Sequence, residues 1–297
     1  MVHGRAEEVE LGTRVDIIIS EWMGFYLLHE SMLDSVVAAR DKHLADDGIM
    51  FPSHARILAA PVSLDTWVAD QFTDWSTVYG FNMTPMAQRA MEIRMQKGQP
   101  EVMQLEEASL LSNPVTVGDT LDLRWVQREE IVKIEDRKFV SIKKDGNFHG
   151  LALWFDVMFD PIVFEDEYAS PFSRVELRTG PADTPTHWKQ TVLVITENMG
   201  AGECVYVYTC VKINKNIFMN KNICSGAGCE EDEIVGWELS MEQSAGNCRQ
   251  YSLGLQLLDP ESDEHPVPCY CGMAKCTLIA ALLEKEEQDM EDLEEIS

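Results

Sequence analysis

Residues 15–32 read VDIIISEWMGFYLLHESM, and this stretch decides the interpretation of the fold. Val15–Ser20 forms a near-continuous apolar run of the kind found in parallel strands that are buried on both faces. Glu21 follows the run directly, and Glu30 lies at the far end of an aromatic-rich loop that contains Gly24. Open α/β sheets bind ligands at the carboxyl ends of their strands, so we expect both carboxylates at a binding site. Two acids converging there suit a planar cation, for which the guanidinium of arginine is the obvious candidate.

The composition is that of an ordinary globular chain. The 297 residues are 45% hydrophobic and 25% charged, enough for one large domain or two domains with their own cores. No apolar run approaches the roughly 18 residues of a membrane span. The N-terminus has neither the basic start nor the apolar centre of a signal peptide. We therefore expect an intracellular protein that does not contact membranes.

The formal net charge of −27 indicates basic partners. Such a field repels the phosphates of nucleic acids and attracts positively charged proteins, so we expect no direct nucleic acid binding. Part of the charge lies in the nearly continuous acidic stretch 284–295, which we expect to be solvated and mobile. Two interpretations carry about equal weight: the acidity serves solubility, or the substrates are rich in arginine and lysine.

The sequence changes character near residue 52. A helix is predicted from about Glu30 to Leu44, with Gly48 supplying a left-handed stop. Residues 49–51 then form one more strand, which Pro52 ends. Residues 1–52 are therefore predicted to be the last units of an α/β sheet.

Beyond Pro52 the pattern alternates and favours an antiparallel barrel or sandwich over residues 53–258. Candidate strands are 56–60, 121–126, 138–142, 151–157, 190–195, 205–208 and 251–255. Residues 66–112 form a helical or irregular insertion rich in aromatic residues and methionine, a composition typical of partner surfaces.

All eight cysteines lie in the last third of the chain. Cys269, Cys271 and Cys276 suggest a zinc site, in the segment 259–297 that also holds the acidic tail. However, the spacings lack paired C-x-x-C units, and the histidines are not interleaved with the cysteines. Reduced thiols and no metal are therefore the expectation.

A second motif, Thr186-His187-Trp188, precedes a predicted strand. Trp188 can form an aromatic wall beside a cationic substrate, and His187 can hold or accept a proton near neutral pH. Taken alone, a histidine before a strand is more often structural, and Glu21 and Glu30 could equally be ordinary exposed acids. The two motifs are informative together.

Residues 20–24 (SEWMG) with Glu30-Ser31-Met32 closely resemble the double-E loop of protein arginine methyltransferases, and residues 186–188 resemble that family's THW loop. The resemblance runs from about residue 2 to about residue 258. It implies that Glu21 and Glu30 clamp the substrate guanidinium and that His187 stands beside them as a third catalytic residue. It also implies that Trp188 lines the substrate channel.

The resemblance extends to the cofactor, S-adenosylmethionine, because residues 4–10 are similar to a family segment that binds adenine. It implies that Glu7 and the backbone of Ala6 face the adenine amino group, and that Met32 packs near the sulfonium. The insertion at 66–112 would contain the family's dimerisation arm. A homodimer acting on Arg-rich proteins, such as histones or RNA-binding proteins, in the nucleus or cytoplasm is the implied setting.

One departure from the family pattern concerns the cofactor domain. No G-x-G-x-G follows a strand, and the acidic residue that would hold the ribose hydroxyls is missing. The expected fold is therefore the C-terminal remnant of a Rossmann-like methyltransferase sheet followed by an antiparallel β-barrel with a helical dimerisation-arm insertion. The apolar edge of strand 15–20 is expected to be exposed. The alternative to an active methyltransferase is an inactive family member that serves as a dimerising or protein-binding partner.

Overall fold

The structure is a computed structural model. It describes residues 2–70, 77–86, 89, 100–161, 173–195, 205–206, 209–213, 228–269 and 271–295, without the side chains of 205–213 and 286–295.

The chain begins with a β-α-β unit made of β1 (Val15–Ile19), α1 (Met32–His43) and β2 (Leu44–Phe51). The two strands pair in parallel, with Ile19 opposite Phe51. Helix α1 buries the positions Leu33, Val36, Val37 and Arg40, which recur at the spacing of one helix face. The predicted strand, helix and strand are all present.

The apolar run of β1 predicts a strand buried on both faces, but the structure shows otherwise. Ile17 is 44% exposed and Ile19 is 79% exposed. Within the described residues β1 pairs with β2 alone, in a two-stranded sheet. The prediction of a buried strand is therefore wrong, whereas the expectation of an exposed apolar edge is confirmed.

The predicted glycine stop after α1 is also wrong. Helix α1 ends at His43 because Leu44 is extended, with φ −72° and ψ 136°. The chain passes directly into β2, which contains Gly48, and Gly48 is not among the glycines with positive φ. Leu44 belongs to the strand because it pairs with Val15 of β1.

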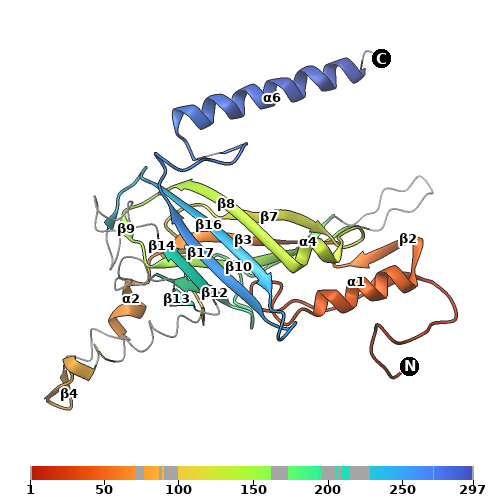
Figure 1. Ribbon diagram of the computed structural model, residues 1–297, viewed down its shortest axis with the longest axis horizontal. Helices are drawn as coiled ribbons and strands as arrows, with labels where there is room; N and C mark the ends of the chain where they lie inside the picture. The colour runs from red at the N-terminus through yellow and green to blue at the C-terminus, as the bar shows by residue number, and fades with distance from the viewer. Residues whose placement is uncertain are drawn as a thin grey trace.

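The larger sheet has the order β6-β12-β10-β3-β7, with β11 also on β10. Figure 1 labels its strands β3, β7, β10 and β12. Its strands are β3 (His54–Val62), β6 (Glu101–Met103), β7 (Val115–Asp122), β10 (Gly150–Phe159), β11 (Val175–Arg178) and β12 (Gln190–Val194), and every pairing is antiparallel. Strand β10 lies at the centre and is buried from Gly150 to Met158.

The second sheet has the order β13-β14-β17-β16-β8. Its strands are β8 (Lys133–Ser141), β13 (Val205–Tyr206), β14 (Thr209–Ile213), β16 (Ile234–Gln243) and β17 (Tyr251–Leu258). Only β14 and β17 pair in parallel. Helix α4 (Arg128–Val132) links β7 to β8 between the sheets. The other short elements are η3 (Glu107–Ser109), between β6 and β7, and the pair β9 (Gly146–Asn147) with β15 (Gly228–Cys229).

One hydrophobic core joins both sheets to the first unit. It includes Phe155 from the larger sheet, Leu239 and Leu255 from the second sheet, and Trp22 and Leu33 from the first 52 residues. The antiparallel prediction is therefore confirmed. The described strands form two sheets around this core and not one continuous closed sheet.

Most predicted strands coincide with β3, β8, β10, β12 and β17, but the strand predicted at 121–126 is wrong. Strand β7 ends at Asp122, and the carboxylate of Asp122 accepts the N–H of Arg124 at 2.9 Å. This local hydrogen bond turns the chain, so Trp125 lies in a turn and its backbone N–H donates to the carbonyl of Asp122. Of the predicted strand 205–208, residues 205–206 form β13, and 207–208 lie outside the described residues.

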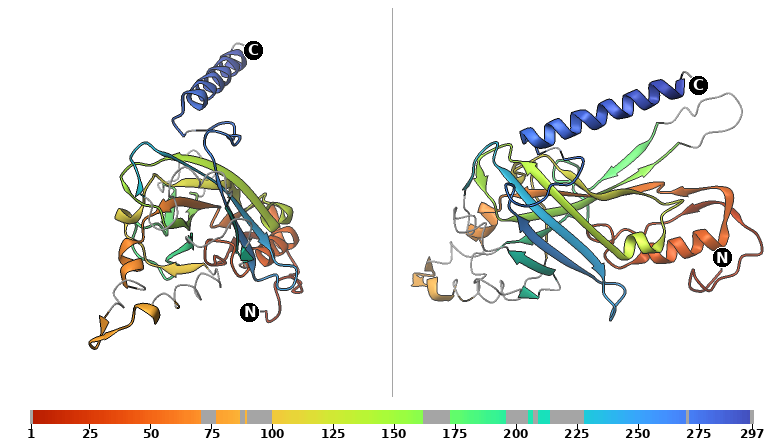
Figure 2. Two further views of the ribbon diagram at one scale, coloured as in Figure 1. Left: turned by 60° about the vertical axis from the view of Figure 1, so that its left-hand side comes forward. Right: turned by 45° about the horizontal axis from the view of Figure 1, so that its top comes forward.

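The insertion leaves the body of the molecule at α2 (Asp65–Val68) and carries a short hairpin of β4 (Thr77–Val78) and β5 (Phe81–Asn82) (Figures 1 and 2). Residues 101–103, which the sequence analysis places in the insertion, pair with β12 in the larger sheet. Residues 71–76 and 90–99 lie outside the described residues.

The acidic C-terminus forms a helix, and its expected mobility stays a prediction. Helix α6 (Ala274–Glu295) runs for 22 residues and stands away from the body in Figures 1 and 2. Its sequence is dominated by Ala, Leu, Glu and Lys, which have the highest helix propensities, and this outweighs charge repulsion. None of the helices in the described part of the chain combines the length and apolar character needed to cross a membrane.

Candidate functional site

The double-E loop, residues 21–30, is a tight backbone structure. Gly24 and Leu27 exchange two backbone hydrogen bonds of 2.9 and 3.0 Å. A Cβ at position 24 would lie 1.8 Å from the carbonyl oxygen of His29, so only glycine fits there. Tyr26 and Leu27 have φ of 42° and 75°, a left-handed conformation that costs free energy outside glycine. The loop therefore holds a specific, strained shape.

The two acids project from this buried backbone into solvent. Glu21 and Glu30 are exposed, whereas the intervening Trp22, Leu27 and Leu28 are at most 2% exposed. Glu21 accepts the backbone N–H of Met23 at 3.1 Å, which fixes the direction of one carboxylate. Among the described residues, neither carboxylate forms an ion pair with a basic side chain. Both carboxylates are thus accessible to a cation from a bound ligand.

The turn between β16 and β17 clasps the far end of the loop. The backbone N–H of Glu30 donates to the carbonyl of Arg249 at 2.8 Å. The side-chain amide of Gln243 donates to Ser31 and to Asp34, each at 2.9 Å. Sequence reasoning missed these contacts because more than 200 residues separate the partners.

The THW loop reaches the same place from the larger sheet. The indole N–H of Trp188 donates to the carbonyl of Met23 at 2.8 Å, across 165 residues of sequence. Trp188 packs edge-on against the buried Phe155, with ring centroids 5.3 Å apart. His187 is exposed, and its ring lies 3.9 Å from that of Trp188. The two sequence motifs are therefore in direct contact in the fold.

The residues assigned to the cofactor gather at the start of α1. The Ser35 hydroxyl donates to Glu7, which lowers the pKa of that carboxyl, and the Arg5 guanidinium lies 3.6 Å from its other oxygen. Met32 is three residues before Ser35 on the helix and is 43% exposed. Glu7 thus contacts the helix that carries Met32, and both side chains are exposed. Ala6 is exposed in the same segment.

His29 is a residue of the loop that the sequence analysis did not single out. Its Nδ1 lies 3.1 Å from the Tyr26 hydroxyl, and its ring contacts those of Phe25 and Tyr26. Burial lowers the pKa of His29, with the Glu30 carboxylate opposing the shift. The available signal was an imidazole between two aromatic residues and an acid, which is common in any aromatic loop.

Comparisons with known proteins identify the family of the chain. The profile of the arginine methyltransferase oligomerization subdomain matches residues 53–225. The chain is 34% identical over 232 residues to the probable protein arginine N-methyltransferase 6.1 of Oryza sativa subsp. indica, covering 73% of this chain and 60% of that protein. It is 32% identical over 208 residues to protein arginine N-methyltransferase 1 of Schizosaccharomyces pombe, covering 69% of this chain and 56% of the relative.

Solved structures show the same fold at lower identity. The Trypanosoma brucei PRMT1 enzyme-prozyme heterotetrameric complex with AdoHcy superposes with a TM-score of 0.61 at 23% identity, covering 89% of this chain and 70% of that chain. Arabidopsis thaliana protein arginine methyltransferase 10 superposes with a TM-score of 0.59 at 24% identity, covering 87% and 74%. The chain spans 54–60% of the length of the first curated relatives. It belongs to the protein arginine methyltransferase family.

Proposed function

We propose that the protein transfers a methyl group from S-adenosylmethionine to a guanidinium nitrogen of arginine in basic proteins of the nucleus or cytoplasm. The observation that carries the proposal is the hydrogen bond from Trp188 to Met23, which joins the THW loop to the double-E loop. It places the segment that carries an aromatic ring and an imidazole against the loop that carries the two exposed carboxylates.

The carboxylates answer a chemical difficulty of the substrate. A guanidinium stays charged in proteins, and its nitrogens are poor nucleophiles because their lone pairs are delocalised. Glu21 and Glu30 would bind the cation from two edges and draw its positive charge towards one side. Electron density would then rise on the nitrogen that accepts the methyl group, through positioning and electrostatic stabilisation.

His187 and Trp188 would complete the substrate side. The exposed ring of His187 lies beside Trp188, where an imidazole nitrogen can take the proton that leaves the methylated guanidinium. The face of Trp188 would line the arginine channel through a cation–π contact. The indole N–H donates to the carbonyl of Met23, and this hydrogen bond fixes the orientation of the ring.

Glu7 and Met32 would serve the cofactor side. When bound, S-adenosylmethionine supplies an electrophilic methyl group on its sulfonium. Glu7, whose carboxylate accepts the Ser35 hydroxyl, would accept hydrogen bonds from the adenine amino group together with the backbone of Ala6. Met32 would pack against the sulfonium and limit the space for a second methyl group.

The insertion would mediate assembly into a homodimer. The matched family segment is an oligomerization subdomain, and the hairpin β4–β5 carries two exposed aromatic residues, Tyr79 at 96% and Phe81 at 72%. Large apolar side chains exposed at the end of a projecting element are typical of an interface.

The test is methylation of an Arg-rich peptide by the full-length protein and by Glu21→Gln and Glu30→Gln. Each variant should lower kcat at least about 100-fold, as loss of one preorganised electrostatic contact does in other enzymes. Glu106→Gln, at an exposed acid far along the chain, is the matched control. Unchanged rates in both variants would contradict the guanidinium clamp. A wild-type protein that dimerises in sedimentation experiments but neither binds the cofactor nor methylates would support the inactive-partner alternative.

A further inference from the structure

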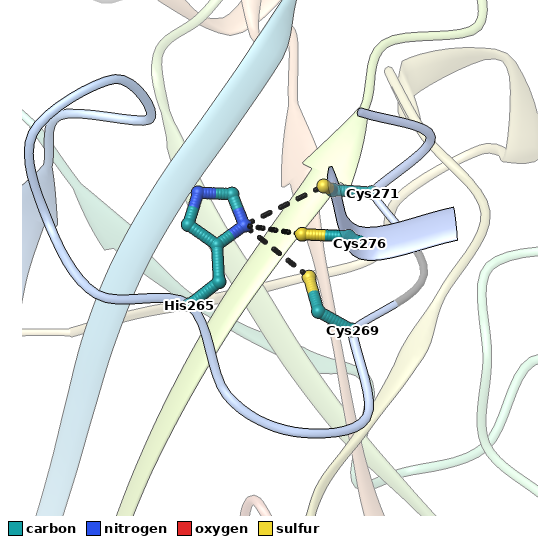
Figure 3. Close-up of side chains that lie close together, drawn as sticks. All are labelled: His265, Cys269, Cys271 and Cys276. Carbon is teal, nitrogen blue, oxygen red and sulfur yellow. Dashed lines mark hydrogen bonds between the residues drawn. The ribbon is translucent and has the colours of Figure 1, made fainter. Parts of the chain in front are cut away.

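A second polar cluster lies at the opposite end of β16 and β17, in the cysteine loop, which we define as residues 259–276. His265, Cys269, Cys271 and Cys276 come together there (Figure 3). Their four ligand atoms all lie within 4.8 Å of one another. The three cysteines are 1–5% exposed and are unoxidised.

The distances in the cluster are those of a metal coordination sphere. The Nδ1 atom of His265 lies 3.5, 3.5 and 3.2 Å from the Sγ atoms of Cys269, Cys271 and Cys276. In a tetrahedral zinc site, Zn–S bonds of about 2.3 Å and Zn–N bonds of about 2.0–2.1 Å place the nitrogen about 3.6 Å from each sulfur. The observed separations therefore leave room for one ion at the centre.

Hydrogen bonding alone does not account for this convergence. An imidazole nitrogen offers one N–H or one lone pair, so Nδ1 can satisfy one thiol at a time and not three. Three buried sulfurs directed at one nitrogen are the arrangement that a shared cation requires.

The other nitrogen of His265 is already fixed. Nε2 lies 3.0 Å from the carbonyl oxygen of Pro260. A carbonyl only accepts hydrogen bonds, so Nε2 carries the proton and Nδ1 presents a lone pair to the cluster. This backbone contact is the kind that orients histidine ligands in metal sites.

The rest of the loop holds the ligands against the second sheet. The His265 ring stacks on Phe139 of β8, with centroids 3.7 Å apart and planes 6° apart. Phe139, Leu258 and the three cysteines form one buried cluster. Arg137 of β8 donates to the carbonyl of Glu264 at 3.1 Å, and the Asp263 carboxylate accepts the N–H of Asp259 at 2.7 Å.

We propose that His265, Cys269, Cys271 and Cys276 bind one zinc ion that fastens the cysteine loop and the first turn of α6 to β8 and β17. Three sulfurs and one nitrogen select zinc among the common divalent ions. Four protein ligands in a buried setting leave no position for substrate, so the site is structural. The expectation of no metal came from the spacing of cysteines and histidines alone, whereas His265 completes the spacing H-x3-C-x-C-x4-C and the four side chains converge in the fold.

The first test is the metal content of the 297-residue chain purified without chelator. About one zinc per chain is expected, as a four-ligand site holds a single ion. Exchange for Co²⁺ should produce thiolate-to-cobalt charge transfer in the near ultraviolet and the visible bands of tetrahedral cobalt. X-ray absorption should find three sulfurs and one nitrogen around the metal. These measurements use wild-type protein, so a variant that misfolds cannot obscure them.

Variants then assign the ligands. Cys269→Ser should lower zinc affinity at least about tenfold, whereas Cys248→Ser, at an exposed cysteine outside the cluster, should leave it unchanged. The proposal is overturned if wild-type protein neither retains zinc nor gives the cobalt–thiolate bands. It is equally overturned if the absorption data show fewer than three sulfurs, if protein kept under reducing conditions has a disulfide among these cysteines, or if Cys248→Ser loses zinc as Cys269→Ser does.

Discussion

The double-E loop and the cysteine loop lie at opposite ends of the same two strands. The turn that joins β16 to β17 binds the double-E loop through the carbonyl of Arg249, which accepts the N–H of Glu30, and Gln243 at the end of β16 binds Ser31 directly after the loop. At the other end, Leu258 closes β17 against the cysteine loop. The polar groups of the two loops differ in exposure. Glu21 and Glu30 are exposed to solvent, whereas the three cysteines of the cysteine loop are buried.

This difference separates two ways of building a site. The double-E loop is shaped by its backbone and its apolar anchors, so its carboxylates remain free for a ligand from outside. The cysteine loop is shaped by the side chains that converge in it, so its polar groups contact one another and are not available to an outside ligand. Changes to the backbone should therefore harm the first loop most, and changes to ligand side chains should harm the second.

The largest effect is expected from Gly24→Ala. The new Cβ would lie 1.8 Å from the carbonyl oxygen of His29, so the loop backbone must move. We expect the free energy of unfolding, measured with urea, to fall by about 3 kcal/mol or more, because a backbone clash in a packed loop cannot relax cheaply.

The matched control is Gly246→Ala, in the turn that follows β16. A Cβ there meets nothing within 4 Å, so the change should be neutral to within about 0.5 kcal/mol. Equal stabilities for the two variants would mean that the double-E loop is not shaped by its backbone. Zinc content should be the same in both, because neither residue touches the cysteine loop.

A smaller effect is expected from Trp188→Phe. This variant keeps an aromatic ring against Phe155 but removes the N–H that reaches Met23 at 2.8 Å. One lost hydrogen bond to a buried carbonyl should cost about 1–2 kcal/mol. Hydrogen exchange should become faster in residues 21–30 and stay unchanged in residues 259–276.

Trp125→Phe serves as the control, since Trp125 is 65% exposed in the turn after β7. Faster exchange in both loops after Trp188→Phe would contradict a local effect of this hydrogen bond on the double-E loop, because it would indicate a general loss of stability.

The parts of the fold that the sequence predicts are those set by local periodicity. The apolar spacing of α1 and the buried run of β10 identify these elements directly. Periodicity failed where local hydrogen bonds or propensity decide. The hydrogen bond from Arg124 to the Asp122 carboxylate ends the strand that was predicted to continue to residue 126. Residues with high helix propensity make the acidic stretch helical.

The candidate site was predictable as a set of residues but not as an arrangement. The motifs name Glu21, Glu30 and Trp188, yet the contact of Trp188 with Met23 depends on two sheets packing around one core. The cysteine loop was harder still. Its convergence needs the turn at Asp259–Asp263 and the Pro260 carbonyl that orients His265, and neither is visible in cysteine spacing.

The smallest effect concerns acid, and it comes from His29 in the double-E loop. Burial lowers the pKa of His29 in the folded protein, with Glu30 opposing, so the unfolded chain takes up the proton first as pH falls. The free energy of unfolding should therefore fall as pH drops below about 6.5, the ordinary pKa of histidine, and should be constant above it. The contribution of His29 should stay below about 1 kcal/mol, because the ring is only half-buried and solvent screens its charge.

His29→Asn should flatten the pH dependence measured by urea unfolding between about pH 7.5 and 5.5, the range over which an unperturbed histidine takes up its proton. It should also remove the acid-induced increase of hydrogen exchange in residues 21–30. His149 provides a matched control, because burial also lowers its pKa, with Asp65 opposing, and its Nδ1 accepts the N–H of Leu64 at 2.9 Å beside the ends of β3 and β10. His149→Asn should flatten the global curve as well, yet leave acid-induced exchange in residues 21–30 as it is in the wild type. If both variants changed that exchange equally, acid would be loosening the whole fold. His29 would then not control the acid stability of the double-E loop. The only remaining difference from the cysteine loop would be that the double-E loop is shaped by its backbone.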